Sequence, residues 1–385
     1  MRSWHTATLA EVATVVGRGI TPRYADHGAM IVVNQRCIRD GRVDLGPSRL
    51  HDSNSRPVVG EKLLRPGDIL VNSTGVGTLG RTAPVKSLGA SATVDSHVTI
   101  VRPNSTTDGA WLGYALSLAE SEIESMAEGS TGQTELSRHR LALLTLKVPP
   151  LDEQRAIAAT LGALDDKIEA NRRLVDLIPR LIRAMVFDAL GAHPGVVAVS
   201  DIATFVNGGA YTKGASGTGR IVIRIAELNS GPGGSTVYSD IDVPEEKTAR
   251  AGDILMSWSG SLGLYRWFRD EAIVNQHIFK VLPSDGYPSW LVFDRLDTVM
   301  PVFQAIAKDK ATTMGHIQRG HLETTTVEIP TPETIDLLGG LIAPLWQRLL
   351  LAEREVVELT ALRDALLPEL LSGRIRVPEA DGAVA

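Results

Sequence analysis

The sequence is short of cysteine, of long apolar runs and of the features that mark an exported chain. Its single cysteine, Cys37, excludes an internal disulfide framework and is typical of a reducing compartment. It has no run of about 18 or more apolar residues, which argues against a membrane span. The start, MRSWHTATLAEVATVV, lacks the charged segment and long apolar core of a signal peptide. These absences together predict a cytoplasmic protein without membrane association.

The chain also lacks the residue patterns of a metal site and of common enzyme motifs. One thiol excludes a cysteine-based zinc site, and the nine histidines show no ligand spacing, so no metal is expected. Neither a G-x-x-x-x-G-K-[ST] phosphate loop nor an Asn-Pro-Pro-aromatic methyltransferase motif is present. In DVPEEK, Asp242 and Glu245 lie too close together for two strands to converge on a metal. We therefore predict no catalytic residue and no cofactor on this chain.

The charge balance is weakly acidic, which is unfavourable for a protein that binds nucleic acid by charge alone. The chain carries 39 basic and 45 acidic residues, a formal net charge of −6. Residues 1–149 hold 16 basic against 14 acidic residues, whereas residues 331–385 hold 5 against 9. Net charge bears on solubility and non-specific binding, and it does not exclude a basic face.

Four blocks of sequence occur twice, in the same order. The pairs are Leu9–Gly19 with Val199–Gly209, Lys62–Gly75 with Lys247–Gly260, Val94–Pro103 with Val274–Pro283, and Leu136–Pro150 with Ile317–Thr331. Their offsets lie between 180 and 190 residues. A shared order and a near-constant offset predict a tandem duplication.

A glycine-rich stretch, GDILVNSTGVGTLGRTAPV, places Gly75, Gly77 and Gly80 in dinucleotide-binding spacing. Such a site needs a helix directly after the glycines, and Pro84 argues against one. The second copy keeps only the first glycine, as Gly260. We therefore predict a loop between two strands. Three side chains give this loop phosphate- or base-binding chemistry in each copy, with Ser73, Thr74 and Arg81 mirrored by Ser257, Ser259 and Arg266.

Each copy ends in a long helical pattern whose apolar residues are alternately three and four positions apart, as in a coiled coil. The predicted seam comprises Ile157, Leu161, Leu164, Ile168, Ile178 and Ile182 in the first copy, and Ile342, Leu345, Leu349, Val356 and Leu359 in the second. Asn171 fills the one gap in the first pattern. Asp152 is a candidate N-cap, and Pro179 and Pro344 predict kinks.

Each helix spans roughly 55–60 Å at 1.5 Å per residue, too long to bury its seam alone in a small domain. Pairing the two helices in opposite directions solves this problem; the alternative is two core helices in one compact fold. We expect an α+β fold of two similar mixed α/β domains separated by two long antiparallel coiled-coil helices, a pseudo-two-fold repeat. The expected segments are domains at 1–150 and 192–331, helices at 151–191 and 332–376, and a tail at 377–385.

The blocks LRPGDILVNSTG and Gly129–Leu174, with the second-copy segments DILMSWSG and LETTTVEIPTPETIDLLGGLIAPL, resemble the DNA-specificity subunit of type I restriction-modification systems. The resemblance extends from Leu9 to Val377. The second copy departs from the pattern, since TPETIDLL replaces PLDEQRAI and TTMGHIQ replaces STGQTEL.

This resemblance implies that each domain is a target-recognition domain that reads one half of a bipartite double-stranded DNA target. It implies that the helices set the spacing between the halves and dock two methyltransferase subunits, which a motor-nuclease restriction subunit can join. The chemistry then belongs to these partners: N6-adenine methylation with S-adenosylmethionine, or cleavage with ATP and Mg²⁺. We expect weak, salt-sensitive DNA binding by this chain alone.

Residues that could meet DNA are those whose side chains reach base edges or phosphates. The first-domain candidates are Asn34, Gln35, Arg36, Ser73, Thr74, Gly75, Arg81, Thr131, Gln133, Thr134 and Arg138. The second-domain candidates are Arg220, Arg224, Ser259, Ser261, Arg266, Lys308, Lys310, Thr312, Thr313, His316, Gln318 and Arg319. His97 and His277 occupy equivalent positions, and for these we favour a structural role within each sheet over catalysis. The alternative function is a coiled-coil scaffold with two binding modules that do not bind DNA.

Overall fold

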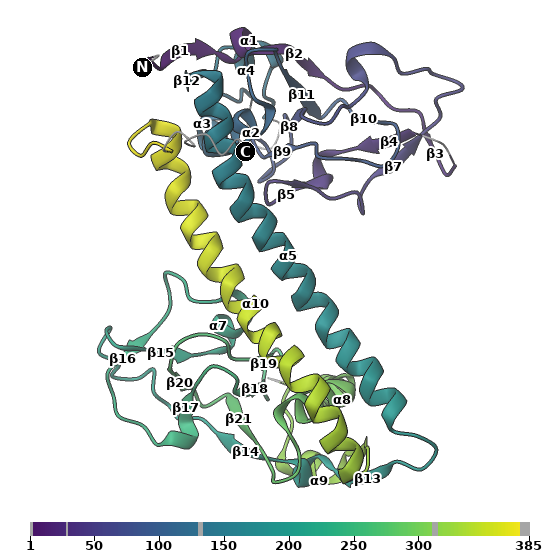
Figure 1. Ribbon diagram of the computed structural model, residues 1–385, viewed down its shortest axis with the longest axis vertical. Coiled ribbons are helices and arrows are strands. Elements are labelled where there is room, and N and C mark those ends of the chain that lie inside the picture. Colours follow the sequence, from purple (N-terminus) through teal and green to yellow (C-terminus); the bar gives the residue numbers. More distant parts are fainter. Residues whose placement is uncertain (1–2, 28–29, 130–133, 310–314, 378–385) are drawn as a thin grey trace, which may run out of the picture. The chain divides into compact units, whose positions relative to one another are not determined.

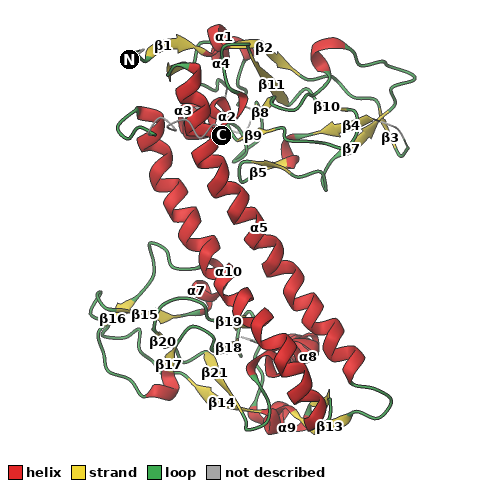
Figure 2. Cartoon of the chain, viewed as in Figure 1, coloured by secondary structure: helices red, strands yellow, loops and turns green. Residues whose placement is uncertain are grey.

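The computed structural model describes residues 3–27, 30–129, 134–309 and 315–377 (Figure 1). The chain divides into two compact units. Unit 1 comprises Met1–Asp166 and Thr360–Ala385, and unit 2 comprises Lys167–Leu359. Each unit contains one copy of the repeat and a part of both long helices, and each mixes helices with strands (Figure 2).

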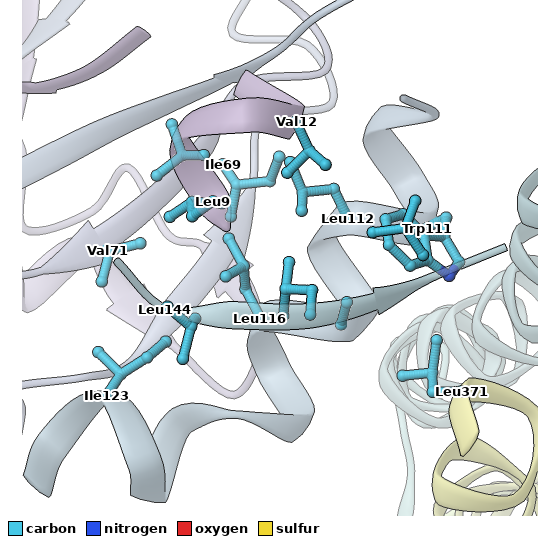
Figure 3. Packing of buried hydrophobic residues seen from close by; sticks show 14 of the residues in the cluster. Leu9, Val12, Ile69, Val71, Trp111, Leu112, Leu116, Ile123, Leu144 and Leu371 are labelled. Carbon is cyan, nitrogen blue, oxygen red and sulfur yellow. The ribbon is translucent and has the colours of Figure 1, made fainter. Parts of the chain in front are cut away.

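The main sheet of unit 1 is antiparallel, with the strand order β2-β11-β8-β9. The strands are β2 (Ala13–Arg18), β11 (Val98–Pro103), β8 (Ile69–Asn72) and β9 (Thr82–Pro84). Helix α2 (Gly109–Leu118) packs on this sheet through Trp111, Leu112 and Leu116, which share a buried cluster with Ile69 and Val71 (Figure 3). The runs of β8 and β11, rich in β-branched residues, are buried along almost their whole length, as expected for strands covered on both faces.

A smaller sheet of unit 1 has the order β10-β4-β7-β3 and includes one parallel pair, β4 with β10. Its strands are β10 (Ala92–Val94), β4 (Met30–Val33), β7 (Arg49–His51) and β3 (Tyr24–Ala25). The chain between β4 and β7 forms a 3₁₀ turn, η1 (Gln35–Cys37), and a hairpin of β5 (Ile38–Arg39) and β6 (Arg42–Val43). The remaining elements are β1 (His5–Thr8), α1 (Leu9–Val12), η2 (Gly60–Lys62), α3 (Glu120–Ser125), α4 (Arg138–Ala142) and β12 (Thr145–Val148).

Unit 2 repeats this fold. Its main sheet has the order β14-β21-β18-β19, formed by β14 (Ala203–Asn207), β21 (Ile278–Pro283), β18 (Ile254–Ser257) and β19 (Gly263–Arg266). Its smaller sheet, β16-β15-β20-β17, again contains one parallel pair, β15 (Arg220–Ile223) with β20 (Ala272–Val274). The other elements are β13 (Gly195–Ala198), α6 (Val199–Ile202), α7 (Ile225–Ser230), β16 (Tyr238–Ser239), η3 (Glu245–Lys247), β17 (Thr248–Ala249), α8 (Ser289–Asp309), α9 (Arg319–Thr324) and β22 (Thr326–Ile329). The matching sheets confirm the predicted duplication.

One glycine in each unit is fixed by a close approach of two backbones. A Cβ on Gly19 would lie 2.1 Å from the carbonyl oxygen of Val94, and one on Gly208 would lie 2.2 Å from that of Asn275. No other residue fits either place without moving the chain. These two glycines are structurally equivalent, so the sequence pairing of Gly19 with Gly209 is one residue off. The cause is a bulge beside β2, at Arg102 and Pro103.

The glycine-rich stretch joins β8 to β9 in an antiparallel pair, and no helix follows it. This confirms the predicted strand-to-strand loop, in which Gly75, Gly77 and Gly80 all have positive φ. The corresponding loop in unit 2 is shorter. As a result Arg266, opposite Ile254, matches Pro84, opposite Ile69, and does not match Arg81 as predicted. In the strands before these loops, Ser257, opposite Ile278, matches Asn72, opposite Val98, and does not match Ser73 as predicted.

The two long helices are α5 (Leu151–Ala189) and α10 (Pro332–Ser372). Helix α5 begins one residue before Asp152, which therefore lies in the first turn and is not the N-cap. Neither Pro179 nor Pro344 ends its helix. Both helices are followed by a glycine with positive φ, Gly191 after α5 and Gly373 after α10.

Within each unit the two helices pack side by side. In unit 2, Ile178, Ile182, Ile342 and Leu349 share a buried cluster with Trp290 and Leu291 of α8. In unit 1, Ile157 and Leu161 share a cluster with Leu370 and Leu371. Ile168 is also buried, whereas Leu164, Leu345, Val356 and Leu359 are half-buried.

Helix α10 is, within the described residues, the one helix long and apolar enough to cross a membrane, judged on length and composition alone. A third of its most apolar window is buried inside the protein. Ile342 and Leu349 in that region pack on α5, as described above.

Candidate nucleic-acid interface

Four segments that are distant in the sequence meet at the end of β8 in unit 1. The Ser73 N–H donates to the His97 carbonyl (2.9 Å), and the Leu136 N–H donates to the Ser73 carbonyl (2.9 Å). The Asn72 side-chain amide donates to the Gln35 carbonyl (3.0 Å). We call residues 34–36, 73–81, 95–97 and 134–138 the strand-end site of unit 1. It brings together those first-domain residues predicted to meet DNA that the structure describes.

Unit 2 builds the same junction at the end of β18. The Trp258 N–H donates to the His277 carbonyl (3.2 Å), and the Ile317 N–H donates to the Trp258 carbonyl (3.1 Å). The Gly260 N–H also donates to the Gly315 carbonyl (3.0 Å). Residues 258–262, 275–277 and 315–319 form the strand-end site of unit 2. The two sites share their backbone frame although their side chains differ.

A histidine and a hydroxyl form the same pair in both sites. Thr74 Oγ1 and His97 Nδ1 are 2.9 Å apart, and Ser259 Oγ and His277 Nδ1 are 3.0 Å apart. Each ring therefore orients the loop that follows β8 or β18. This favours the structural role expected for both histidines, although the partner is the loop and not the sheet.

Arg18 fixes the strand-end site of unit 1 and was missed by the sequence analysis. Its guanidinium donates to the Ser96 carbonyl (2.8 Å), to Glu135 Oε1 (2.7 Å) and to the Leu136 carbonyl (2.6 Å). One side chain thus joins two of the four segments. No local motif signals this role, because the partners lie about 80 and 120 positions away in the sequence.

In unit 2 the aromatic side chain of Trp258 helps to hold the strand-end site together, as Arg18 does in unit 1. Trp258 Nε1 donates to Asn207 Oδ1 (2.9 Å), and the ring lies 5.6 Å from that of His277 and 5.8 Å from that of Phe279. In unit 1 the matching residue is Ser73, whose hydroxyl is fully buried against Thr99 Oγ1 (2.6 Å). The equal frames are therefore held by different side chains.

The predicted DNA-binding residues differ in exposure. Arg36, Arg138, Ser261, Lys308, Gln318 and Arg319 are exposed, and Asn34, Gln35, Thr74, Gly75, Arg81, Thr134 and His316 are half-buried. Gly260, Leu262, Gln304, Ala307, Lys308 and Gly315 line an open cleft of about 220 Å³ beside the unit 2 site. Thr131, Gln133, Lys310, Thr312 and Thr313 lie outside the described residues.

Three arginines predicted to meet DNA are instead bound to carboxylates of their own unit. Arg220 donates to Glu271 (2.7 Å), and Arg224 donates to Glu227 (2.6 Å), which raises the pKa of Arg224. Arg266 donates to Glu353 of α10 (2.6 Å) with a side chain only 13% exposed. We therefore correct these three assignments. The carboxylate partners of Arg220 and Arg266 lie in distant segments, so no local sequence pattern indicates them.

Two further assignments change because the side-chain oxygens have internal partners. Ser73 is 0% exposed, so it cannot reach a ligand at the surface. Ser259 is 5% exposed, and its hydroxyl is bound to His277. Asn34 keeps partial exposure, but it caps η1 by accepting from the Arg36 N–H (2.9 Å) and donates to the Pro47 carbonyl (2.7 Å).

Comparison with known proteins finds a likeness to one family in the first half of the chain. Residues 1–180 match the family described as "Type I restriction modification DNA specificity domain". The type I restriction enzyme MjaIX specificity subunit of Methanocaldococcus jannaschii is 30% identical over 70 residues, which are 18% of this chain and 16% of that relative. The chain thus matches less than a fifth of the length of this curated relative.

One solved structure shares the fold over nearly the whole chain. The type I restriction-modification system S subunit from M. genitalium covers 96% of this chain and 96% of its own, with a TM-score of 0.64 and 16% identity. The HsdS subunit from Thermoanaerobacter tengcongensis covers 97% and 98%, with a TM-score of 0.38 and 16% identity. The first of these similarities extends the likeness of fold into the second half of the chain.

Proposed function

We propose that this chain is a member of the type I restriction-modification DNA-specificity family and that it recognises double-stranded DNA at two half-sites, one with each strand-end site. The observation that carries the proposal is the strand-end site itself, built twice with matching backbone and histidine–hydroxyl bonds. A frame fixed by backbone hydrogen bonds can hold different side chains against different bases. The duplicated frame therefore suits a target made of two unlike halves.

Exposed and half-buried side chains at the two sites provide the chemistry for reading bases. Arg81 and Arg138 suit guanine, which offers two acceptors in the major groove. Gln318 suits adenine, and Arg319 and Lys308 suit guanine or phosphate. The alternative, a scaffold that does not bind DNA, is less favoured because the matching family is a DNA specificity domain.

Catalysis in this proposal belongs to partner subunits. Two methyltransferase subunits would carry S-adenosylmethionine and methylate adenine, and a restriction subunit would use ATP and Mg²⁺ to cleave. This chain would position them on DNA. A docking surface for them is suggested by one flank of the helix pair in unit 2.

That flank is identified by an ion pair between Lys167 of α5 and Glu355 of α10 (3.3 Å). Leu181 lies 14 residues after Lys167, and Leu341 lies 14 residues before Glu355, which is close to four full turns in each case. Both leucines therefore share the flank marked by the ion pair. With Leu177, Leu337 and Leu351 they form what we call the leucine flank.

The leucine flank is exposed and apolar. Leu337 is 73% exposed and Leu341 60%, and the other three members are about half exposed. The opposite flank is covered by unit 2 itself, where Val186 and Trp346 are buried. A large exposed apolar patch fits a binding surface for another protein. We assign it to an apolar helical face of the methyltransferase subunit.

Half-site recognition is tested by binding with the chain assembled with its methyltransferase. The unit 1 variant is Arg81→Ala with Arg138→Ala, and the unit 2 variant is Gln318→Ala with Arg319→Ala. Each variant should discriminate less well between the target and a duplex altered in the half that its unit reads, by about 1–3 kcal/mol for each base contact removed. Discrimination at the other half should not change. The measurement is Kd for the target and for duplexes altered in one half.

Arg374→Ala serves as the control, because Arg374 is exposed and lies two residues after the end of α10, and this variant should leave recognition of both halves unaffected. If both variants still reject both altered duplexes as the wild type does, the strand-end sites are not the readers.

A further inference from the structure

The loop that follows β8 in unit 1 carries an apolar residue at its apex. Val76 is 82% exposed, the highest value among the large apolar side chains that the structure describes. Its neighbours Gly75 and Gly77 both have positive φ, so the chain turns sharply on either side of it. Single exposed apolar side chains are common on protein surfaces, so exposure alone assigns Val76 no role. Its place in the strand-end site and the structure of the loop are what distinguish it.

The loop is held in place directly beneath its apex. The Leu79 N–H donates to the Gly75 carbonyl (3.0 Å), which closes the turn around Val76. The φ of Gly75 is 103°, and a Cβ there would lie 2.3 Å from Thr78 Oγ1, so the loop requires glycine at this position. The β-branched side chain of Val76 has few rotamers. Its methyl groups are therefore presented to solvent in an almost fixed position.

Valine is an unusual residue for the apex of a turn. Turns favour glycine, proline, asparagine, aspartate and serine, and a valine left in water contributes nothing to folding through burial. The loop of unit 2 has serine at the equivalent position, because Asn72 matches Ser257 in register and Ser261, like Val76, comes four residues later. Ser261 is also exposed. An apolar apex is thus a feature of unit 1 alone, and folding does not account for it.

Polar groups that suit base edges lie in the same site as this apex. Arg81 follows Val76 in the loop, and the side-chain oxygen of Gln35 accepts from Thr74 Oγ1 (3.2 Å) in the loop. Such side chains match the hydrogen-bonding groups that bases present in the major groove. The major groove also presents one apolar group, the C5-methyl of thymine, which apolar side chains contact. The methyl groups of Val76 offer a matching surface for it.

We propose that Val76 contacts the C5-methyl group of a thymine in the half-site read by unit 1. This inference rests on the proposed function and adds to it the base that the apex reads. The contact removes apolar surface from water and needs no hydrogen bond, so it selects thymine over cytosine and uracil at that position. Because the proposed reaction methylates adenine, the target contains A·T pairs and therefore thymines that such a contact can read.

The test replaces each thymine of the target duplex by uracil, one at a time, and measures Kd for the chain assembled with its methyltransferase. Uracil pairs with adenine as thymine does and lacks only the methyl group. For the wild type, one replacement should weaken binding about fourfold, which corresponds to the loss of one buried methyl group. Val76→Ser should bind the unmodified target about fourfold more weakly, and the same replacement should then have no further effect.

Val59→Ser is the matched control, because Val59 is 72% exposed in the same unit and lies outside the strand-end site. This variant should keep the affinity of the wild type and its sensitivity to uracil.

Two results would overturn the contact. In one, no uracil replacement weakens binding by the wild type. In the other, Val76→Ser weakens binding to the thymine and uracil duplexes by the same factor, as expected for a wedge between bases that does not read the methyl group. If the wild-type complex binds the target no better than a duplex of random sequence, the proposed function itself fails.

Discussion

Asp95 and Asn275 occupy the same position in the two units, at the turn between the parallel pair and the main sheet. Both are buried, and the Asp95 carboxylate accepts from the His97 N–H (2.9 Å). Burial raises the pKa of Asp95, and its bond to His97 offsets this only in part. No arginine or lysine of the described residues forms an ion pair with it. The charged form of Asp95 therefore lowers the stability of unit 1, and unit 2 has no such charge because Asn275 occupies this position.

Asp95→Asn should stabilise the protein at neutral pH, because an amide oxygen keeps the bond to His97 without a buried charge. The folded-state pKa lies above the unfolded one, so the cost is present at neutral pH and disappears as pH falls through the folded value to below about 3.9. A gain of about 1 kcal/mol would raise Tm by about 2–4 °C. Thermal unfolding at pH 7 and at pH 4 measures it. A variant less stable than the wild type at pH 7 contradicts this account.

Single residues were the hardest feature to predict from the sequence. The segments that meet at the strand-end sites were found, because glycines and short polar residues mark loops. Whether each side chain is available to a ligand could not be predicted, since Arg266 and Arg220 are neutralised by partners far away in the chain. Ser73 shows the same limit, because strand register alone decides that it faces inward.

At the scale of elements, hydrophobic periodicity predicted both long helices and most of their seam. The sequence shows that Asn171 interrupts the apolar seam, but it does not show which residues form hydrogen bonds with this side chain. Asn171 is fully buried, donates to Glu355 (2.8 Å) and accepts from Arg348 (2.8 Å). A buried polar residue in a coiled-coil seam specifies register at a cost in stability. The heptad pattern does not reveal which residues on α10 satisfy it.

The leucine flank gives a prediction at the same scale. Leu337→Ser with Leu341→Ser should weaken assembly with the methyltransferase, because each buried leucine contributes about 1.5–3 kcal/mol. Sedimentation or calorimetry of the mixed subunits measures the assembly constant. Val59→Ser with Val196→Ser removes exposed apolar side chains elsewhere and should have no effect. Equal assembly by both variants would place the methyltransferase on another surface.

At the scale of the whole molecule, the repeat was the most informative signal in the sequence. It predicted two similar mixed α/β units, and the matching strand orders of the sheets confirm them. Its alignment failed locally where one copy gained residues: at the bulge beside β2, and in the loop after β8. The replacement of the β5–β6 hairpin by α7 was also hidden, because the matching blocks lie outside that region.

The central claim is that two copies of one reader recognise two half-sites at a spacing set by the paired helices. The most direct test inserts seven residues, one heptad, after Asp166 in α5 and after Leu359 in α10, which preserves the seam. Seven residues lengthen each helix by about 10 Å, equal to about three base pairs at 3.4 Å each. Sequencing the adenines methylated by wild-type and inserted complexes reads out the target. We predict unchanged half-sequences separated by a gap longer by about three base pairs, and an unchanged gap would contradict the account.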